Sequence, residues 1–143
     1  LPTEPVLFAM RTAALAGVAV RLIVPMHSDS RIVEWASTSY IHEVAEAGVK
    51  VYFYQAGFNH SKFLVSDDSV CTCGSTNVDF RSFEHDFEAN VFFFDEGVAL
   101  RMKKIFLDDQ AFSPTFDEIS AHVRFSFRKR LWTSIIRLLS PLL

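Results

Sequence analysis

Apolar and polar positions alternate along the first half of the chain in two recurring patterns. Apolar residues fall at helical spacing over residues 3–17 and 31–47, and a glycine closes each stretch. A short apolar run follows each of them, over residues 18–24 and 49–54, and predicts a strand, the first apolar enough to be buried on both faces. Helix, strand, helix, strand is the order of an α/β fold. We therefore predict a mixed, largely parallel sheet flanked by helices.

The second half of the chain predicts a hairpin, a further strand and a further helix. Residues 63–65 predict a strand that ends in a polar turn, and residues 70–73 predict its returning partner. Residues 87–94 predict another strand, and Asp95 is expected to cap a helix over residues 96–109. We assign to the inner face of this helix Leu100, Ile105 and Phe106, and to its outer face Arg101, Lys103 and Lys104.

Composition and charge indicate one globular unit with a basic tail. The chain has 143 residues, half of them hydrophobic and 15 of them phenylalanine, which suffices for one hydrophobic core. Before His122 there are nine Lys and Arg against 17 Asp and Glu, and from His122 onward five against none. An acidic body argues against broad nucleic-acid binding, so we expect no nucleic-acid partner. Cys71 and Cys73 are expected to be reduced thiols.

Ser113-Pro114 interrupts the chain, and we divide the sequence there. Residues 1–112 hold the candidate chemistry, and residues 113–143 form a basic amphipathic helical segment. Such a segment suits either an anionic membrane surface or a docking site on a missing part of the protein. No uninterrupted apolar run of 18 residues predicts a membrane span. The opening at Leu1-Pro2, without a starting Met, indicates a chain cut from a longer protein.

One stretch carries the candidate chemistry, in the pattern H-x-K-x4-D-x6-G-S-x-N. The specified residues are His60, Lys62, Asp67, Gly74, Ser75 and Asn77. His60 and Lys62 are two residues apart entering a strand, so their side chains emerge on the same face. Imidazole exchanges a proton near neutral pH, while an ammonium, a hydroxyl and an amide hold the oxyanion of a phosphodiester in its transition state. We therefore predict that Lys62, Ser75 and Asn77 bind a substrate phosphate.

The pattern resembles the HKD signature of the phospholipase D superfamily, in register at all its specified residues. The resemblance implies a phospholipase D-like domain for residues 1–112, with one HKD motif and no metal ion or other cofactor. It implies that Asp67 is a supporting structural acid. It also implies that an acid near the following strand hydrogen-bonds the motif histidine and fixes its tautomer. Glu88 matches that position, with Glu84 and Asp86 as rivals. The catalytic candidates are thus His60, Lys62, Asp67 and Glu88.

The flanking sequence narrows the resemblance to one branch of the superfamily. Residues 28–50 and 77–83 are similar to the carboxy-terminal half of bacterial cardiolipin synthases, and the similarity covers nearly the whole chain. By this resemblance the complete enzyme is a phosphatidyltransferase. It transfers a phosphatidyl group between two phosphatidylglycerol molecules through a phosphohistidine, giving cardiolipin and glycerol. The implied location is the bacterial inner membrane, reached through segments absent here, with this domain on the cytoplasmic side.

The superfamily's chemistry needs two HKD motifs, and this chain has one, because no other His is followed by Lys two residues on. The second motif is expected from the missing N-terminal half or from another subunit. In two-motif members the first histidine is usually the nucleophile, which implies that His60 is the general acid and base. Two alternatives stay open: a homodimeric phosphodiesterase or nuclease of the same superfamily, and a non-catalytic membrane-binding module.

Two further side chains are candidates for the pocket. Arg81 either offers a second cation to a lipid phosphate or pairs with Asp79 or Glu84. His27 lies in a loop that follows a predicted strand, which is where α/β proteins place their sites.

Overall fold

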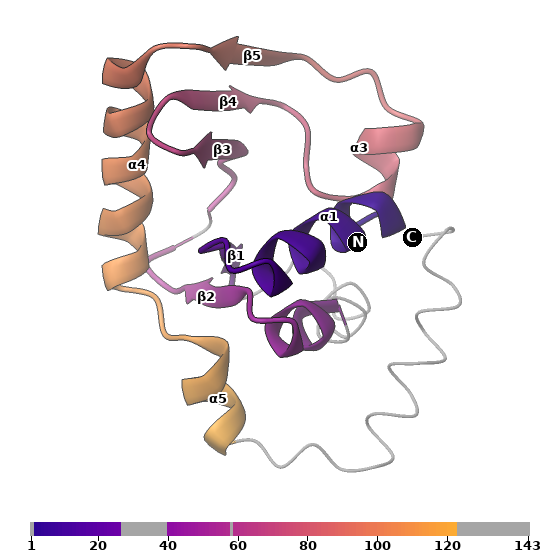
Figure 1. The fold of residues 1–143 in the computed structure, drawn as a ribbon, viewed down its shortest axis with the longest axis vertical. Coiled ribbons are helices and arrows are strands. Elements are labelled where there is room, and N and C mark those ends of the chain that lie inside the picture. The colour runs from indigo at the N-terminus through magenta and orange to yellow at the C-terminus, as the bar shows by residue number, and fades with distance from the viewer. Residues whose placement is uncertain (1, 27–39, 58, 123–143) are drawn as a thin grey trace.

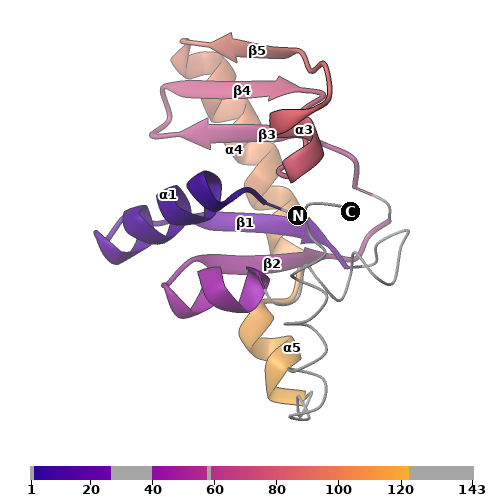
Figure 2. The same ribbon diagram turned by 90° about the vertical axis from the view of Figure 1, so that its right-hand side faces the viewer.

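The computed structural model describes residues 2–26, 40–57 and 59–122, with helices and strands in the predicted order (Figure 1). The helices are α1 Glu4–Leu15, a helix over residues 40–46, α3 Phe80–Glu84, α4 Glu96–Ala111 and α5 Phe116–His122. The strands are β1 Arg21–Pro25, β2 Lys50–Tyr54, β3 Phe63–Ser66, β4 Val70–Gly74 and β5 Asn90–Phe93. Helices lie on both sides of the strands in Figures 1 and 2, which confirms the predicted α/β architecture.

The strands form two sheets rather than the single mixed, largely parallel sheet that we predicted. β1 and β2 pair in parallel, whereas β3, β4 and β5 form an antiparallel sheet in that order. The turn between β3 and β4 is too short for a crossover, so these two strands can pair only in antiparallel fashion. The connection from β4 to β5 is longer and contains α3, and it also brings the chain back antiparallel. Figure 2 shows the two sheets one above the other, with α4 running behind both.

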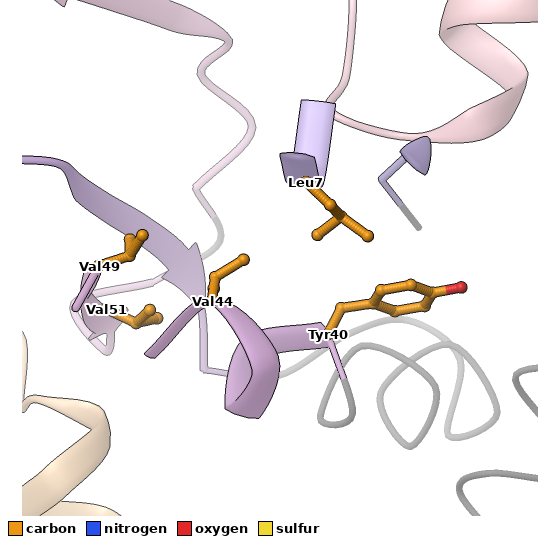
Figure 3. Packing of buried hydrophobic residues seen from close by; sticks show 5 residues of the cluster. All are labelled: Leu7, Tyr40, Val44, Val49 and Val51. Carbon is orange, nitrogen blue, oxygen red and sulfur yellow. The ribbon is translucent and has the colours of Figure 1, made fainter. Parts of the chain in front are cut away.

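The main core lies between the parallel pair and the two helices of the first half. It consists of the buried side chains of Leu7, Tyr40, Val44, Val49 and Val51. Figure 3 shows Leu7 of α1 pointing toward Tyr40. Leu22 and Val24 of β1 pack against this core, but β1 is half-buried rather than buried on both faces as predicted. An apolar run indicates burial, yet it does not say how completely each face of the strand is covered.

Both helices of the first half end where the sequence predicts. Gly17 and Gly48 have φ angles of 89° and 100°, a left-handed conformation that glycine adopts without strain and that ends a helix. Thr3 occupies the N-cap position of α1, although its side chain forms no capping hydrogen bond.

The predicted hairpin of β3 and β4 is confirmed, and α4 fastens it. Asp67 and Asp68 have φ angles of 49° and 61°, and the Ser69 N–H donates to the Ser66 carbonyl at 3.2 Å, which closes a tight turn. Lys103 of α4 forms an ion pair with Asp68. The turn of the hairpin is therefore tied to the helix that packs on its sheet.

Helix α4 has the predicted start but a different inner face. The Asp95 side chain accepts a hydrogen bond from the Val98 N–H at 2.8 Å, as expected of an N-cap. Ala99 is fully buried, whereas Leu100 and Ile105 are 44% and 50% exposed, so our assignment of these two to the inner face is wrong. The ring of Phe106 does contact that of Phe63 edge to face, at 6.3 Å between centroids.

The inner stripe of α4 therefore runs through positions 99, 103 and 106, which follow one another at helical spacing. Lys103, assigned to the outer face, lies in this stripe and reaches Asp68 with its ammonium. A buried alanine and an ion-paired lysine stand where two large aliphatic residues were expected.

The chain beyond α4 returns to the parallel sheet. The Phe53 N–H donates to the Pro114 carbonyl at 2.9 Å, and Thr115 forms a bridge with Tyr52. α5 follows against β2, while residues 123–143 of the predicted basic segment lie outside the described residues. The predicted division of the chain into residues 1–112 and 113–143 stays a prediction. No helix in the described ranges is both long and apolar enough to cross a membrane.

Candidate active site

Three chain segments meet at one end of the antiparallel sheet, where the predicted site residues other than Asp67 lie. β3 begins there just after Lys62, β4 ends there at Gly74, and β5 begins there at Asn90. The Gly74 N–H donates to the Lys62 carbonyl at 3.2 Å, and the Ser75 N–H donates to the Ala89 carbonyl at 3.0 Å. These bonds place the entry to β3, the bend after β4 and the segment before β5 side by side, at the α3 end of the sheet (Figure 1).

Gly74 is required by the closeness of these segments. A Cβ atom at this position would lie 2.2 Å from the Ala89 carbonyl oxygen, 2.2 Å from Asn90 Oδ1 and 2.7 Å from Asn90 Cα. No side chain fits at these distances, so only glycine allows the bend and the start of β5 to touch. Gly74 therefore sets the distance between the bend after β4 and the start of β5.

Ser75 and Glu88 are joined by a hydrogen bond across this contact. The Ser75 hydroxyl donates to Glu88 Oε2 and accepts from the Ala89 N–H at 3.1 Å. An ionised carboxylate only accepts hydrogen bonds, so the single hydroxyl proton is directed at Glu88. In this geometry Ser75 fixes the carboxylate, and donation to a phosphate oxygen requires its O–H to turn away. The pairing of Glu88 with His60 stays a prediction.

His60 and Lys62 stand at the open side of the same end of the sheet. His60 is exposed, and Lys62 is half-buried with its ammonium donating to the His60 backbone carbonyl at 2.9 Å. An ammonium has three N–H donors, so this bond leaves capacity for an anion. The Asn59 side chain accepts the Ser61 N–H at 2.9 Å and shapes the approach to the strand.

Asp67 lies away from this cluster. It forms part of the turn at the opposite end of β3, a strand of four residues that spans about 13 Å. Its carboxylate accepts from the adjacent Ser66 hydroxyl at 3.4 Å. The structure thus brings together the segments that carry His60, Lys62, Ser75 and Glu88 and leaves Asp67 in a turn, while the structural role of Asp67 stays a prediction.

Arg81 forms an exposed ion pair within the segment between Asn77 and Glu88, and its contact with a lipid phosphate stays a prediction. Its guanidinium lies 3.2 Å from Asp86 Oδ1, so Arg81 is ion-paired, although with neither of the partners that we expected. Asp79 instead caps α3 by accepting the Ser82 N–H at 2.8 Å.

Sequence reasoning missed three residues that hold the bend after β4 in place, namely Thr76, Ser82 and Asn90. The Asn90 side-chain amide donates to the Thr76 hydroxyl, and the Asn77 N–H donates to the Ser82 hydroxyl at 3.2 Å. The only signal in the sequence was the capping pattern of Asp79 before a short helix. No cluster of three or more potential metal ligands occurs among the described residues, and His27 lies outside them.

The strands, the hairpin and the motif at its open end define a phospholipase D-like domain. The fold is similar to that of Nuc from Salmonella typhimurium, a member of the phospholipase D family. The TM-score is 0.70, over 81% of this chain and 76% of that chain, at 17% sequence identity. The family model described as the PLD-like domain of cardiolipin synthase matches residues 1–110, so the chain belongs to this family.

Curated relatives match the whole chain. It is 40% identical over 143 residues to a cardiolipin synthase of Clostridium perfringens strain SM101, of which it covers 30%. It is 42% identical to a cardiolipin synthase of Geobacillus thermodenitrificans and 41% identical to cardiolipin synthase 2 of Bacillus cereus, and covers 28% of each. The chain therefore spans less than a third of the length of these relatives.

Proposed function

We propose that this chain is the second phospholipase D-like half of a cardiolipin synthase. The enzyme transfers a phosphatidyl group from one phosphatidylglycerol to another, releasing glycerol. One observation carries the proposal: the H-x-K segment, the G-S-x-N bend and Glu88 meet at one end of a sheet, in a chain about 40% identical throughout to cardiolipin synthases. The lipid substrate places the enzyme at a membrane, for which we propose the cytoplasmic face of the bacterial inner membrane.

The reaction divides between two histidines. A histidine of the partner motif attacks phosphorus, forming an N–P bond while the P–O bond to the leaving glycerol breaks, and His60 donates a proton to that glycerol oxygen. His60 then takes the proton from a hydroxyl of the second phosphatidylglycerol. The oxygen attacks phosphorus and displaces the partner histidine, giving cardiolipin.

The remaining side chains stabilise charge or geometry. Lys62 offers its ammonium to the non-bridging oxygens, and the exposed side chain of Asn77 offers a neutral donor. Ser75 adds a second neutral donor when its hydroxyl turns from Glu88 toward the phosphate. Glu88 orients His60 through its imidazole N–H.

The partner motif comes from the N-terminal half of the same enzyme. The relatives are more than three times as long as this chain, which leaves room for a second phospholipase D-like half. A homodimeric phosphodiesterase is the second candidate, favoured by the single H-x-K motif. A dimer of this chain alone that cleaves phosphodiesters without forming cardiolipin would select it.

The proposed function is tested by His60→Ala in the complete enzyme, with cardiolipin formation measured from phosphatidylglycerol in mixed micelles. His85→Ala is the matched control, because His85 is exposed and contacts Phe80 edge to face rather than the site. We expect His60→Ala to abolish transfer and His85→Ala to leave it unchanged. Transfer at the wild-type rate after His60→Ala would refute the proposed role.

A further inference from the structure

Ser82 is a buried polar residue behind the bend that carries Asn77. The residue is only 7% exposed, although it lies in the short helix α3, whose other residues are half-buried or exposed. Its N–H donates to the Asp79 carboxylate at 2.8 Å, and its hydroxyl oxygen accepts the Asn77 N–H at 3.2 Å. Asp79 therefore holds Ser82, and Ser82 holds the backbone of Asn77.

The bend after β4 is held at three successive residues. The Ser75 N–H is bonded to the Ala89 carbonyl, the Thr76 hydroxyl to the Asn90 amide, and the Asn77 N–H to the Ser82 hydroxyl. The first two bonds tie the bend to the start of β5. Of these three bonds, only the third ties the bend to α3, and it is formed by Asn77, which is exposed.

We propose that Ser82 is a positioning residue, which fixes the direction in which Asn77 presents its side-chain amide to the substrate phosphate. The inference rests on the proposed function for its catalytic consequence, but not for the hydrogen bond itself. An exposed amide on an unrestrained backbone samples many directions, and a donor aimed in advance stabilises the transition state better than one that must be reoriented. Without the Ser82 hydroxyl, the Asn77 N–H loses its acceptor and the bend can rotate after Thr76.

The effect is expected on turnover rather than on substrate binding. Misplacing a catalytic group by about 1 Å lowers the rate by roughly a hundredfold, so Ser82→Ala should lower kcat by about ten- to a hundredfold. KM should stay within about twofold, because the ammonium of Lys62, which is proposed to bind the phosphate, is unchanged. Ser82 acts through Asn77, so the double variant Ser82→Ala with Asn77→Ala should be no slower than Asn77→Ala alone.

The experiment combines two readouts on the complete enzyme. Hydrogen exchange at the Asn77 amide reports the bond directly, and transfer kinetics with phosphatidylglycerol report its consequence. Ser113→Ala is the matched control, because Ser113 is also 7% exposed and its hydroxyl donates to the Asp109 carbonyl at 2.7 Å, at the end of α4. We expect Ser82→Ala to speed exchange at Asn77 at least tenfold and to lower kcat, and Ser113→Ala to do neither.

Three outcomes would overturn the inference. They are unchanged exchange at Asn77 in Ser82→Ala, a kcat within twofold of wild type, and a loss of kcat that adds to that of Asn77→Ala. A wild-type enzyme that forms no cardiolipin would instead refute the proposed function, and the exchange readout would still decide whether Ser82 holds Asn77.

Discussion

Substituting Gly74 by alanine tests the geometry of the site most sharply. The added Cβ would lie 2.2 Å from both the Ala89 carbonyl oxygen and Asn90 Oδ1, and 2.7 Å from Asn90 Cα. Ordinary contacts to carbon need more than 3 Å, so the start of β5 has to move by about 1 Å. Two of the three atoms belong to the backbone, and rotating a side chain cannot relieve the clash.

The expected cost has a structural and a catalytic part. Overpacking costs about 1–3 kcal/mol, and weakening the bond from the Ser75 N–H to the Ala89 carbonyl costs about 1 kcal/mol more. We therefore expect a loss of about 2–4 kcal/mol in the free energy of unfolding. Glu88 precedes Ala89 and moves with it, so its displacement of about 1 Å should lower kcat by roughly a hundredfold.

Urea unfolding and transfer kinetics measure the two parts, with Gly97→Ala as the matched control. A Cβ at Gly97 meets only the Asp95 side chain, at 3.2 Å, and the position lies in α4, where alanine is the better helix former. The control should change stability by less than about 1 kcal/mol and leave transfer unchanged. If Gly74→Ala were no more destabilising than Gly97→Ala and kept its kcat, the steric reasoning would be wrong.

Three smaller predictions follow from single contacts. Asp95→Ala removes the N-cap of α4 and should cost about 1 kcal/mol in urea unfolding, and an unchanged midpoint would show that the cap is not needed. Lys103→Met breaks the ion pair with Asp68, in which both side chains are 44% exposed. The variant should lose no more than about 1 kcal/mol in the free energy of unfolding, and the difference from wild type should be smaller at high salt. Glu88→Gln keeps an acceptor for Ser75 but removes the charge that orients His60. We expect kcat to fall at least about tenfold while thermal stability stays unchanged. An unchanged pH profile of kcat would contradict the proposed role of Glu88 in orienting His60.

The sequence predicts most elements of the fold because their signals are local. Two apolar stretches each closed by a glycine, and an aspartate placed before an amphipathic run, predict the helix ends that the structure has. The predicted inner face of α4 was wrong because Ala99 is buried and Lys103 pairs with Asp68 of the hairpin, whereas Leu100 and Ile105 are exposed. Which apolar stripe is buried depends on the partner surface rather than on the helix.

The candidate site was likewise predictable only where its signals are local in the sequence. The spacing of the motif places His60 and Lys62 at the entry of a strand and Ser75 in the bend after its partner. The bond between Ser75 and Glu88 and that between Ser82 and Asn77 link residues five to thirteen positions apart through a bend and a short helix. Their geometry follows from how the chain folds back, which no local pattern contains.

The most direct test of the account is the fate of glycerol label from phosphatidylglycerol labelled in its terminal glycerol. Transfer between two phosphatidylglycerol molecules predicts that the complete enzyme divides the label equally, with half in free glycerol and half in the linking glycerol of cardiolipin. The His60→Ala enzyme should release no labelled glycerol and incorporate no label into cardiolipin. Label recovered entirely as free glycerol, with phosphatidic acid as the lipid product, would contradict the account and identify a phosphodiesterase that transfers to water.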